Sequence, residues 1–113
     1  MTVVRNVMVG LHNRAEYNCS VFETLFRLPR HFKTEKAMRA KAKELLRIFD
    51  LENERNNLAC NLPYGKQRKL EIARALATNP KLLLLDEPAA GMNPHETEDL
   101  VKTIKFIRDN FDM

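Results

Sequence analysis

The sequence predicts an α/β fold that is mostly helical, with one short buried strand in its second half. Apolar residues recur at helical spacing through most of the chain, and Pro and Gly interrupt this pattern between segments. An unbroken run of four leucines at residues 82–85 differs from the helical pattern and predicts the strand. The chain has 113 residues, which is enough for one domain at most.

Composition supports a globular protein and excludes several other classes. The hydrophobic fraction is 44% and the charged fraction 30%, unlike a low-complexity disordered chain. The net charge of +4 comes from scattered basic residues, so we expect no nucleic-acid partner. Cys19 and Cys60 match no metal or redox spacing, and we expect two reduced thiols. We expect neither a signal peptide nor a membrane-spanning segment.

Helices are expected throughout the first half. Apolar residues at helical spacing predict the first one over residues 3–11, followed by a polar loop. Ser20 and Glu23 match a capping box and predict a short second helix, which Pro29 should end.

The clearest helix should begin after an N-cap at Thr34 and end near Asp50. Its Lys and Arg residues lie on one face and its apolar residues on the other. The expected inward positions are Met38, Ala42, Leu45, Leu46 and Phe49.

Two further helices are expected in the second half. The first should run from about Lys66 to Ala77, and the sequence Asn79-Pro80 should stop it. The last should begin at an N-cap, Asn93, with Pro94 at the first helical position and Glu96 completing the box. The inward positions should be Leu70, Ala73, Leu76 and Ala77, and then Leu100, Ile104, Ile107 and Phe111.

The leucine strand is expected to be buried, and a buried strand needs neighbours that pair with its backbone. The sequence contains no second confident strand. We therefore expect the strand to belong to a larger sheet, and its exposed edge to favour self-association.

The strand ends in two carboxylates, Asp86 and Glu87. Ligands of open α/β sheets bind at the carboxyl ends of the strands. Asp86 there can hold Mg²⁺ directly or through water, and Glu87 can polarise a water for attack on a phosphoryl group. Upstream, Gly65 opens a helix whose positive N-terminal end suits a phosphate. Taken alone, the acidic strand end is explained almost as well by an ordinary acidic turn, and the helix start at Gly65 is explained better by an ordinary capped helix.

Taken together, residues 62–94, LPYGKQRKLEIARALATNPKLLLLDEPAAGMNP, resemble the ABC ATPase family in order, spacing and residue type. In this family a signature loop opens a helix, and a Walker B strand, a catalytic Glu and a D-loop follow. The resemblance implies that residues 68–76 form the signature helix, that residues 82–86 form Walker B with Asp86 at the Mg²⁺, and that Glu87 is the catalytic carboxylate. It assigns the signature to Leu62, Pro63, Tyr64, Gly65 and Lys66, and the D-loop to Ala90, Gly91, Met92 and Asn93.

Together with the opening MTVVRNVMVG, this stretch is similar to the ATP-binding subunits of branched-chain amino acid importers. Two departures concern the signature. Pro63 replaces the usual Ser, and proline has neither a hydroxyl nor a backbone N–H. Lys66 replaces the usual Gln and supplies a charge with different geometry. We interpret this as a working variant of the signature.

The pattern G-x-x-x-x-G-K-S/T of a P-loop does not occur in these residues. The family's Q-loop Gln and switch His also find no match, and we expect His12, His31 and His95 to be surface or helix-cap residues. The resemblance therefore implies a stretch between the Q-loop and the switch His. Residues 1–61 would form the helical subdomain, and residues 62–113 the signature helix, Walker B strand, D-loop and following helix.

The family's mechanism implies Mg²⁺-dependent ATP hydrolysis between two ATPase subunits that meet head to tail, each signature closing on the ATP held by its partner. The subunits would act on transmembrane permease subunits from the cytoplasmic side of the membrane. Without a P-loop, this stretch alone should not hydrolyse ATP. We expect Lys69 and Arg74 to lie on a solvated helix face.

Three alternatives remain at this level. The chain could derive from another ABC-type ATPase, such as one of DNA repair or chromosome maintenance, although no sustained heptads appear. It could be a non-catalytic module whose basic helix, residues 33–47, contacts nucleic acid or acidic lipid, although a solvated face explains that helix more simply. It could also be a truncated gene product without a function of its own.

Overall fold

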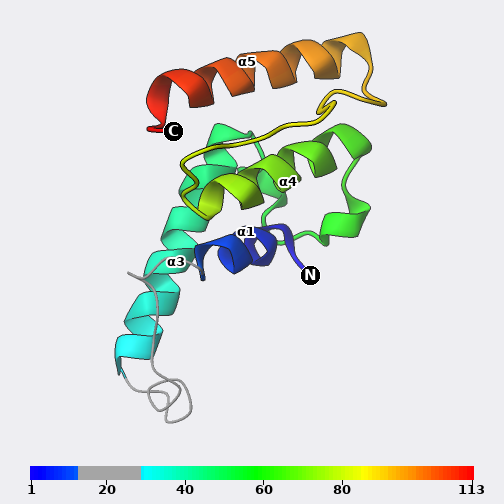
Figure 1. Cartoon of the computed structure of the whole chain (residues 1–113). Coiled ribbons are helices and arrows are strands. Elements are labelled where there is room, and N and C mark those ends of the chain that lie inside the picture. The colour runs from blue at the N-terminus through cyan, green and yellow to red at the C-terminus, as the bar shows by residue number, and fades with distance from the viewer. Residues whose placement is uncertain (13–28) are drawn as a thin grey trace.

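The computed structural model describes residues 1–12 and 29–113 of the chain (Figure 1). The predicted short helix after Ser20, and the thiol of Cys19, lie outside the described residues. Four α-helices are described: α1 (Val3–Leu11), α3 (Pro29–Ile48), α4 (Tyr64–Ala77) and α5 (Pro94–Asn110). Two short 3-10 helices, η2 (Glu52–Glu54) and η3 (Ala59–Asn61), lie between α3 and α4.

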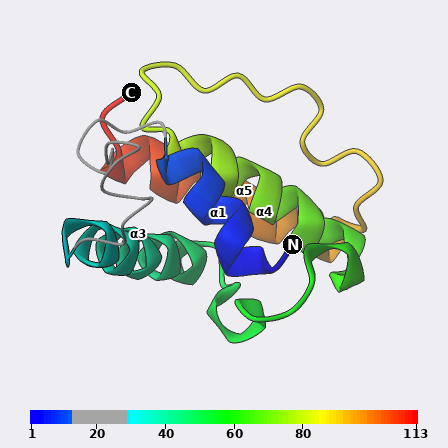
Figure 2. The same ribbon diagram turned by 90° about the horizontal axis from the view of Figure 1, so that it is seen from below.

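Helices α1, α4 and α5 are stacked in this order, with α4 between the other two (Figures 1 and 2). Helix α1 packs against both α3 and α4, and so joins the first half of the chain to the second. One continuous core includes residues from all four helices, from Val3 to Ile107. In the part of the chain that the structure describes, no helix is long and apolar enough to cross a membrane.

Helix α1 forms as predicted. The hydroxyl of Thr2 accepts a hydrogen bond from the backbone N–H of Arg5 and caps the helix. Gly10 lies against α4 so closely that a Cβ atom there would be 2.5 Å from the carbonyl oxygen of Arg74. Val3, Val7 and Leu11 are fully buried on α1, which packs against both α3 and α4.

Helix α3 begins earlier than the sequence predicts. It starts at Pro29, and Thr34 is inside the helix instead of capping it. Proline is well suited to a first helical position, because its missing N–H would have no helical partner there. The predicted inward face is confirmed, since all five of its residues are buried. Past its end, Asp50 has a φ of 57° and the N–H of Leu51 donates to the carbonyl of Leu46 over 2.8 Å, as in a Schellman motif.

Helices α4 and α5 match their predicted faces. Helix α4 begins two positions before the expected start, at Tyr64, and ends before Asn79, whose φ is 57°. The predicted capping box of α5 is confirmed: the side chain of Asn93 accepts from the N–H of Glu96 over 2.8 Å, and the Glu96 carboxylate accepts from the N–H of Asn93. Leu100 and Ile107 are buried, and Ile104 and Phe111 are partly buried against the core.

The predicted buried strand at residues 82–85 is wrong for this structure. The segment has no strand assignment, and the side chains of Leu82 and Leu84 are 72% and 82% exposed. Only Leu83 packs against the core. The described residues contain no strand ladder, only an isolated bridge between Thr2 and Leu58, so this backbone has no neighbour to pair with. The mostly helical character of the fold is confirmed, whereas the expected burial of the leucines in a sheet is not observed.

Candidate functional site

The predicted signature lies in the turn that leads into α4. Leu62 is buried, and the side-chain amide of Gln67 donates to its carbonyl over 2.9 Å. Pro63 is at the N-cap position of α4, where no side chain caps the helix. The first N–H groups of an α-helix have no helical partner. The signature therefore begins a helix without a side-chain cap, and the carboxyl group of Glu96 lies beside its Gly65.

The structure brings the predicted signature and D-loop together. A Cβ atom on Gly91 would lie 3.0 Å from Cε1 of Tyr64, and a Cβ atom on Gly65 would lie 2.9 Å from Cδ of Glu96. Gly91 has a φ of 79°, which favours glycine. The start of α4 therefore fits against the turn that leads into α5, where Asn93 forms the cap.

Arg68 also holds the ring of Tyr64. Its Nε donates to the Tyr64 hydroxyl over 2.9 Å, and its guanidinium lies 5.4 Å from the ring centroid. Hydrogen bonds to the Glu71 carboxylate and then to the Tyr64 hydroxyl raise the pKa of Arg68 above its ordinary value. Arg68 thus remains a cation beside the signature.

The two predicted acidic residues lie in the bend that follows the leucine run and precedes the predicted D-loop. Both Asp86 and Glu87 are exposed, and Asp86 lines an open cleft of about 230 Å³ together with Arg68, Glu71 and the three leucines 83–85. Glu87 has a φ of 46°, in a region that L side chains rarely adopt. Its carbonyl accepts from the N–H of Ala90 over 3.0 Å, which closes the turn toward the D-loop.

A single carboxylate fits a Mg²⁺ ion only in part. Mg²⁺ keeps several waters and uses one or two protein carboxylates together with substrate phosphates. Among the described residues, no group of three His, Cys, Asp or Glu side chains gathers as a metal site would require. Asp86 offers a hard oxygen ligand of the correct type, and substrate oxygens and water would have to complete the coordination.

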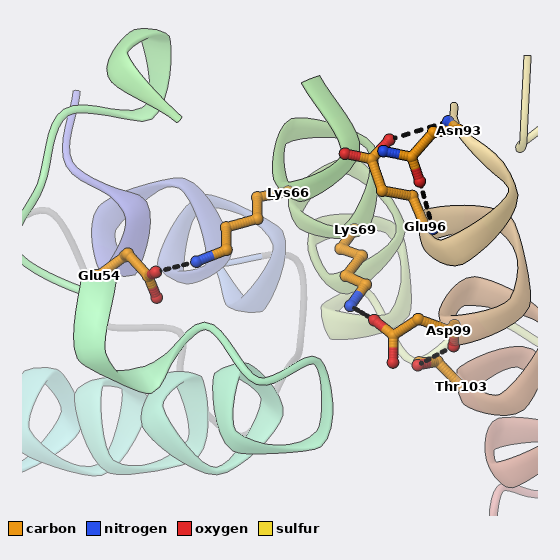
Figure 3. A network of polar contacts seen from close by, with 7 residues as sticks. All are labelled: Glu54, Lys66, Lys69, Asn93, Glu96, Asp99 and Thr103. Atoms are coloured by element: carbon orange, nitrogen blue, oxygen red, sulfur yellow. Dashed lines mark hydrogen bonds and ion pairs between the residues drawn. The ribbon is translucent and has the colours of Figure 1, made fainter. Parts of the chain in front are cut away.

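Two lysines of α4 are held by carboxylates from different elements (Figure 3). Lys66 pairs with Glu54 at the end of η2, and Lys69 pairs with Asp99 on α5. The prediction of a solvated Lys69 is wrong, because its side chain is only 12% exposed and reaches Asp99. Arg74 is exposed as predicted and donates to the Asn6 side chain over 3.4 Å.

Sequence reasoning missed the two pairing carboxylates. Glu54 precedes Lys66 by 12 positions and Asp99 follows Lys69 by 30, so no local pattern indicates either pair. Glu96, by contrast, was found through the capping box. The remaining predictions outside the site agree where they can be compared: Cys60 is a free, exposed thiol, and His12 and His95 are exposed.

Comparison with known proteins decides the family. The family model described as ABC transporter matches residues 3–90, which is most of the chain. The chain belongs to the ABC transporter family. The resemblance carried by the signature, Walker B and D-loop residues is thereby confirmed at the level of the family.

Three relatives of this ABC transporter chain are informative. It is 38% identical over 110 residues to the high-affinity branched-chain amino acid transport ATP-binding protein LivG of Escherichia coli, and 41% identical over 108 residues to BraF of Pseudomonas aeruginosa, which has the same description. These matches cover 97% and 96% of the chain. Among solved structures it is similar to MJ1267, an ATP-binding cassette of an ABC transporter, with a TM-score of 0.72 and 32% identity over 96% of the chain.

The matches cover almost all of this chain but less than half of each matched protein. The chain spans 42% of the length of LivG, of BraF and of MJ1267. The mostly helical fold and the ATP-binding cassette family are therefore established for this ABC transporter chain. What a whole subunit of this kind does remains to be proposed.

Proposed function

We propose that this chain is part of the ATP-hydrolysing subunit of an ABC importer for branched-chain amino acids. The observation that carries the proposal is the fit between signature and D-loop, where the ring of Tyr64 meets Gly91. Two motifs that the ATPase reaction requires are thus adjacent in the folded chain. The substrate class is supported by LivG and BraF, which are branched-chain amino acid transport proteins.

The residue roles follow from chemistry and position. The open start of α4, residues 62–66, is assigned to the phosphates of an ATP held by a second subunit, because free N–H groups and a positive helix end suit an anion. Glu87 is assigned to hold and deprotonate the attacking water. Asp86 is assigned to Mg²⁺, which neutralises phosphate charge when it is bound. The D-loop, residues 90–93, is assigned to position the signature against the acidic segment.

The partners are proposed on the same basis. A second ATPase subunit would meet this one head to tail, and transmembrane permease subunits would contact the helical subdomain, residues 1–61. The subunit would be cytoplasmic and peripheral on the inner face of the cell membrane. We propose no role for nucleic acid.

These 113 residues alone should not turn over ATP, because a P-loop would supply most of the phosphate cradle. Purified chain is expected to release phosphate from ATP no faster than buffer does. Turnover at the rate of an intact transport ATPase would contradict the assignment of a partial site.

The decisive test uses a complete subunit that contains this stretch, reconstituted in vesicles with its permease. Glu87→Gln should lower ATP hydrolysis by about 10²- to 10⁴-fold, the contribution typical of a general base. Glu98→Gln is the matched control, because Glu98 is exposed on α5 and, among the residues that the structure describes, pairs only with Lys102 across one helical turn. Equal hydrolysis by Glu87→Gln and the natural subunit would refute the role of Glu87. If the vesicles hydrolyse ATP without importing branched-chain amino acids, the proposed substrate class is refuted.

A further inference from the structure

We propose that Asp99 is a positioning residue, whose ion pair with Lys69 fixes the direction in which α5 leaves the D-loop and so holds the D-loop against the signature. The inference rests on the proposed function, because it concerns the placement of the D-loop, residues 90–93, beside the start of α4. It assigns a role to two residues that lie outside the signature, the Walker B segment and the D-loop.

The ion pair joins two helices that are far apart in the sequence. Lys69 belongs to α4 and Asp99 to α5, 30 positions later, and their side chains meet between the two helices (Figure 3). Among the described residues it is the only ion pair that joins α4 to α5, because the remaining ion pairs of α5 stay within that helix. The side chain of Lys69 is 12% exposed, and a cation that is mostly buried needs its partner more than a solvated one does.

The same face of α5 makes a second contact with α4. Glu96 and Asp99 are three positions apart, and side chains at this spacing are neighbours on a helix surface. The Glu96 carboxyl group lies beside Gly65, and Asp99 pairs with Lys69, which is four positions further along α4. The two helices therefore run side by side in the same direction, as Figure 1 also shows.

Two separate contacts fix the direction of a helix, whereas a single contact would let it swing. Just before α5 begins, Gly91 lies against the ring of Tyr64, and the D-loop ends at the N-cap, Asn93. Asp99 follows Asn93 at a distance of about 9 Å along the helix axis, at 1.5 Å per residue. The buried Leu100 keeps α5 on the core in either case. Loss of the ion pair should therefore change the angle of α5 and shift the D-loop that precedes it.

The first measurement is amide NMR of the 113-residue chain, with the signal of Gly91 as the reporter of the D-loop. Lys69→Gln should displace this signal and should still fold, because Asp99 is half exposed and stays solvated when it is left unpaired. Asp99→Asn should displace the signal in the same direction. The exchanged pair, Lys69→Asp with Asp99→Lys, should return it toward its natural position. Glu98→Gln, at an exposed position of the same helix, is the control and should leave the signal in place.

The second measurement separates positioning from stability alone. It uses a complete subunit that contains this stretch, reconstituted with its permease. Lys69→Gln and Asp99→Asn should each lower kcat for ATP hydrolysis about three- to tenfold, as expected when a partly buried ion pair that orients the site is lost. The KM for ATP should stay within about twofold, because neither side chain is assigned to the nucleotide. The double variant should be no slower than either single variant, because both changes remove the same contact.

Several results would overturn the positioning role alone. One is a Gly91 signal that stays in place in both single variants, and another is a displaced signal with a natural kcat. A Gly91 signal that the exchanged pair leaves as displaced as Lys69→Gln does, or additive losses of kcat in the double variant, would show that the two residues do not act through their ion pair. Hydrolysis at the natural rate by Glu87→Gln would refute the proposed function, and the positioning role with it.

Discussion

The ring of Tyr64 and the backbone of Gly91 fit together so closely that a Cβ atom on Gly91 would lie 3.0 Å from Cε1 of Tyr64. Arg68 also holds the ring, through its hydrogen bond to the hydroxyl. A contact between two motifs that are distant in sequence is therefore fixed by an aromatic ring, a cation and a glycine. Changes to any of the three should loosen the corner on which the proposed ATPase site depends.

Gly91→Ala should lower the free energy of unfolding by about 1–2 kcal/mol, the cost of a left-handed backbone at a residue with a side chain. Gly91 has a φ of 79°, and the new methyl group would also press on the Tyr64 ring. Urea unfolding followed by far-UV circular dichroism measures the change. In a Tyr64→Ala background the same substitution should cost less, because only the backbone strain remains. Equal costs in the two backgrounds would mean that the ring contact is unimportant.

Gly10→Ala should be more harmful than Gly65→Ala. At Gly10 the new methyl group would meet the carbonyl oxygen of Arg74 at 2.5 Å and Cβ of Ala77 at 2.9 Å. These atoms belong to the body of α4 and cannot move aside, so α1 and α4 must separate at a cost of about 1–3 kcal/mol. At Gly65 the nearest atoms are those of the flexible Glu96 carboxyl group. Thermal unfolding of both variants provides the comparison, and a Gly10→Ala chain as stable as Gly65→Ala would contradict the close helix contact.

The pair of Arg47 and Glu52 should make stability depend weakly on pH. Arg47 Nε and Nη2 both donate to the Glu52 carboxylate over 3.2 Å. This hydrogen bonding, followed by the charge of Arg47, lowers the pKa of Glu52 below its ordinary value. The stabilisation is therefore present above the unfolded-state pKa of Glu52 and is lost as pH falls through its lower, folded-state pKa.

Arg47→Gln should return the pKa of Glu52 to its ordinary range, which a carboxyl ¹³C NMR titration measures directly. Lys43→Gln is the control, because Lys43 is the weakest of the cations that lower the pKa of Glu52. A Glu52 pKa that Arg47→Gln leaves low would show that another group is responsible.

Self-association should arise from the exposed leucine segment. Leu82 and Leu84 are among the most exposed large apolar residues described, and within residues 1–12 and 29–113 the backbone of residues 82–85 has no strand partner. An unpaired extended segment with apolar side chains readily pairs with another chain. Leu84→Glu should therefore lower the average mass in sedimentation equilibrium at high protein concentration. Phe106→Glu, on the outer face of α5, tests the alternative that any exposed apolar residue acts in this way.

The helices could be predicted because their information is local. The spacing of Val4, Val7 and Leu11 defines the buried face of α1, and Asn93 and Glu96 define the start of α5 through contacts three residues apart. The start of α3 was missed for a local reason as well. Pro29 can either follow a helix or open one, and only the folded chain shows that it opens α3.

The sequence by itself predicted the ABC transporter family, which the family comparison confirmed, and it supplied the proposed residues of the signature, Walker B segment and D-loop, because these motifs are ordered patterns along the chain. Only the tertiary structure decided that Tyr64 meets Gly91, that Glu54 holds Lys66 and that Asp99 holds Lys69. It also decided that the four leucines remain extended and mostly exposed. The physical reason is common to all of these: an ion pair, a close backbone contact and a strand ladder each need a partner from a distant part of a chain, and no local pattern specifies that partner.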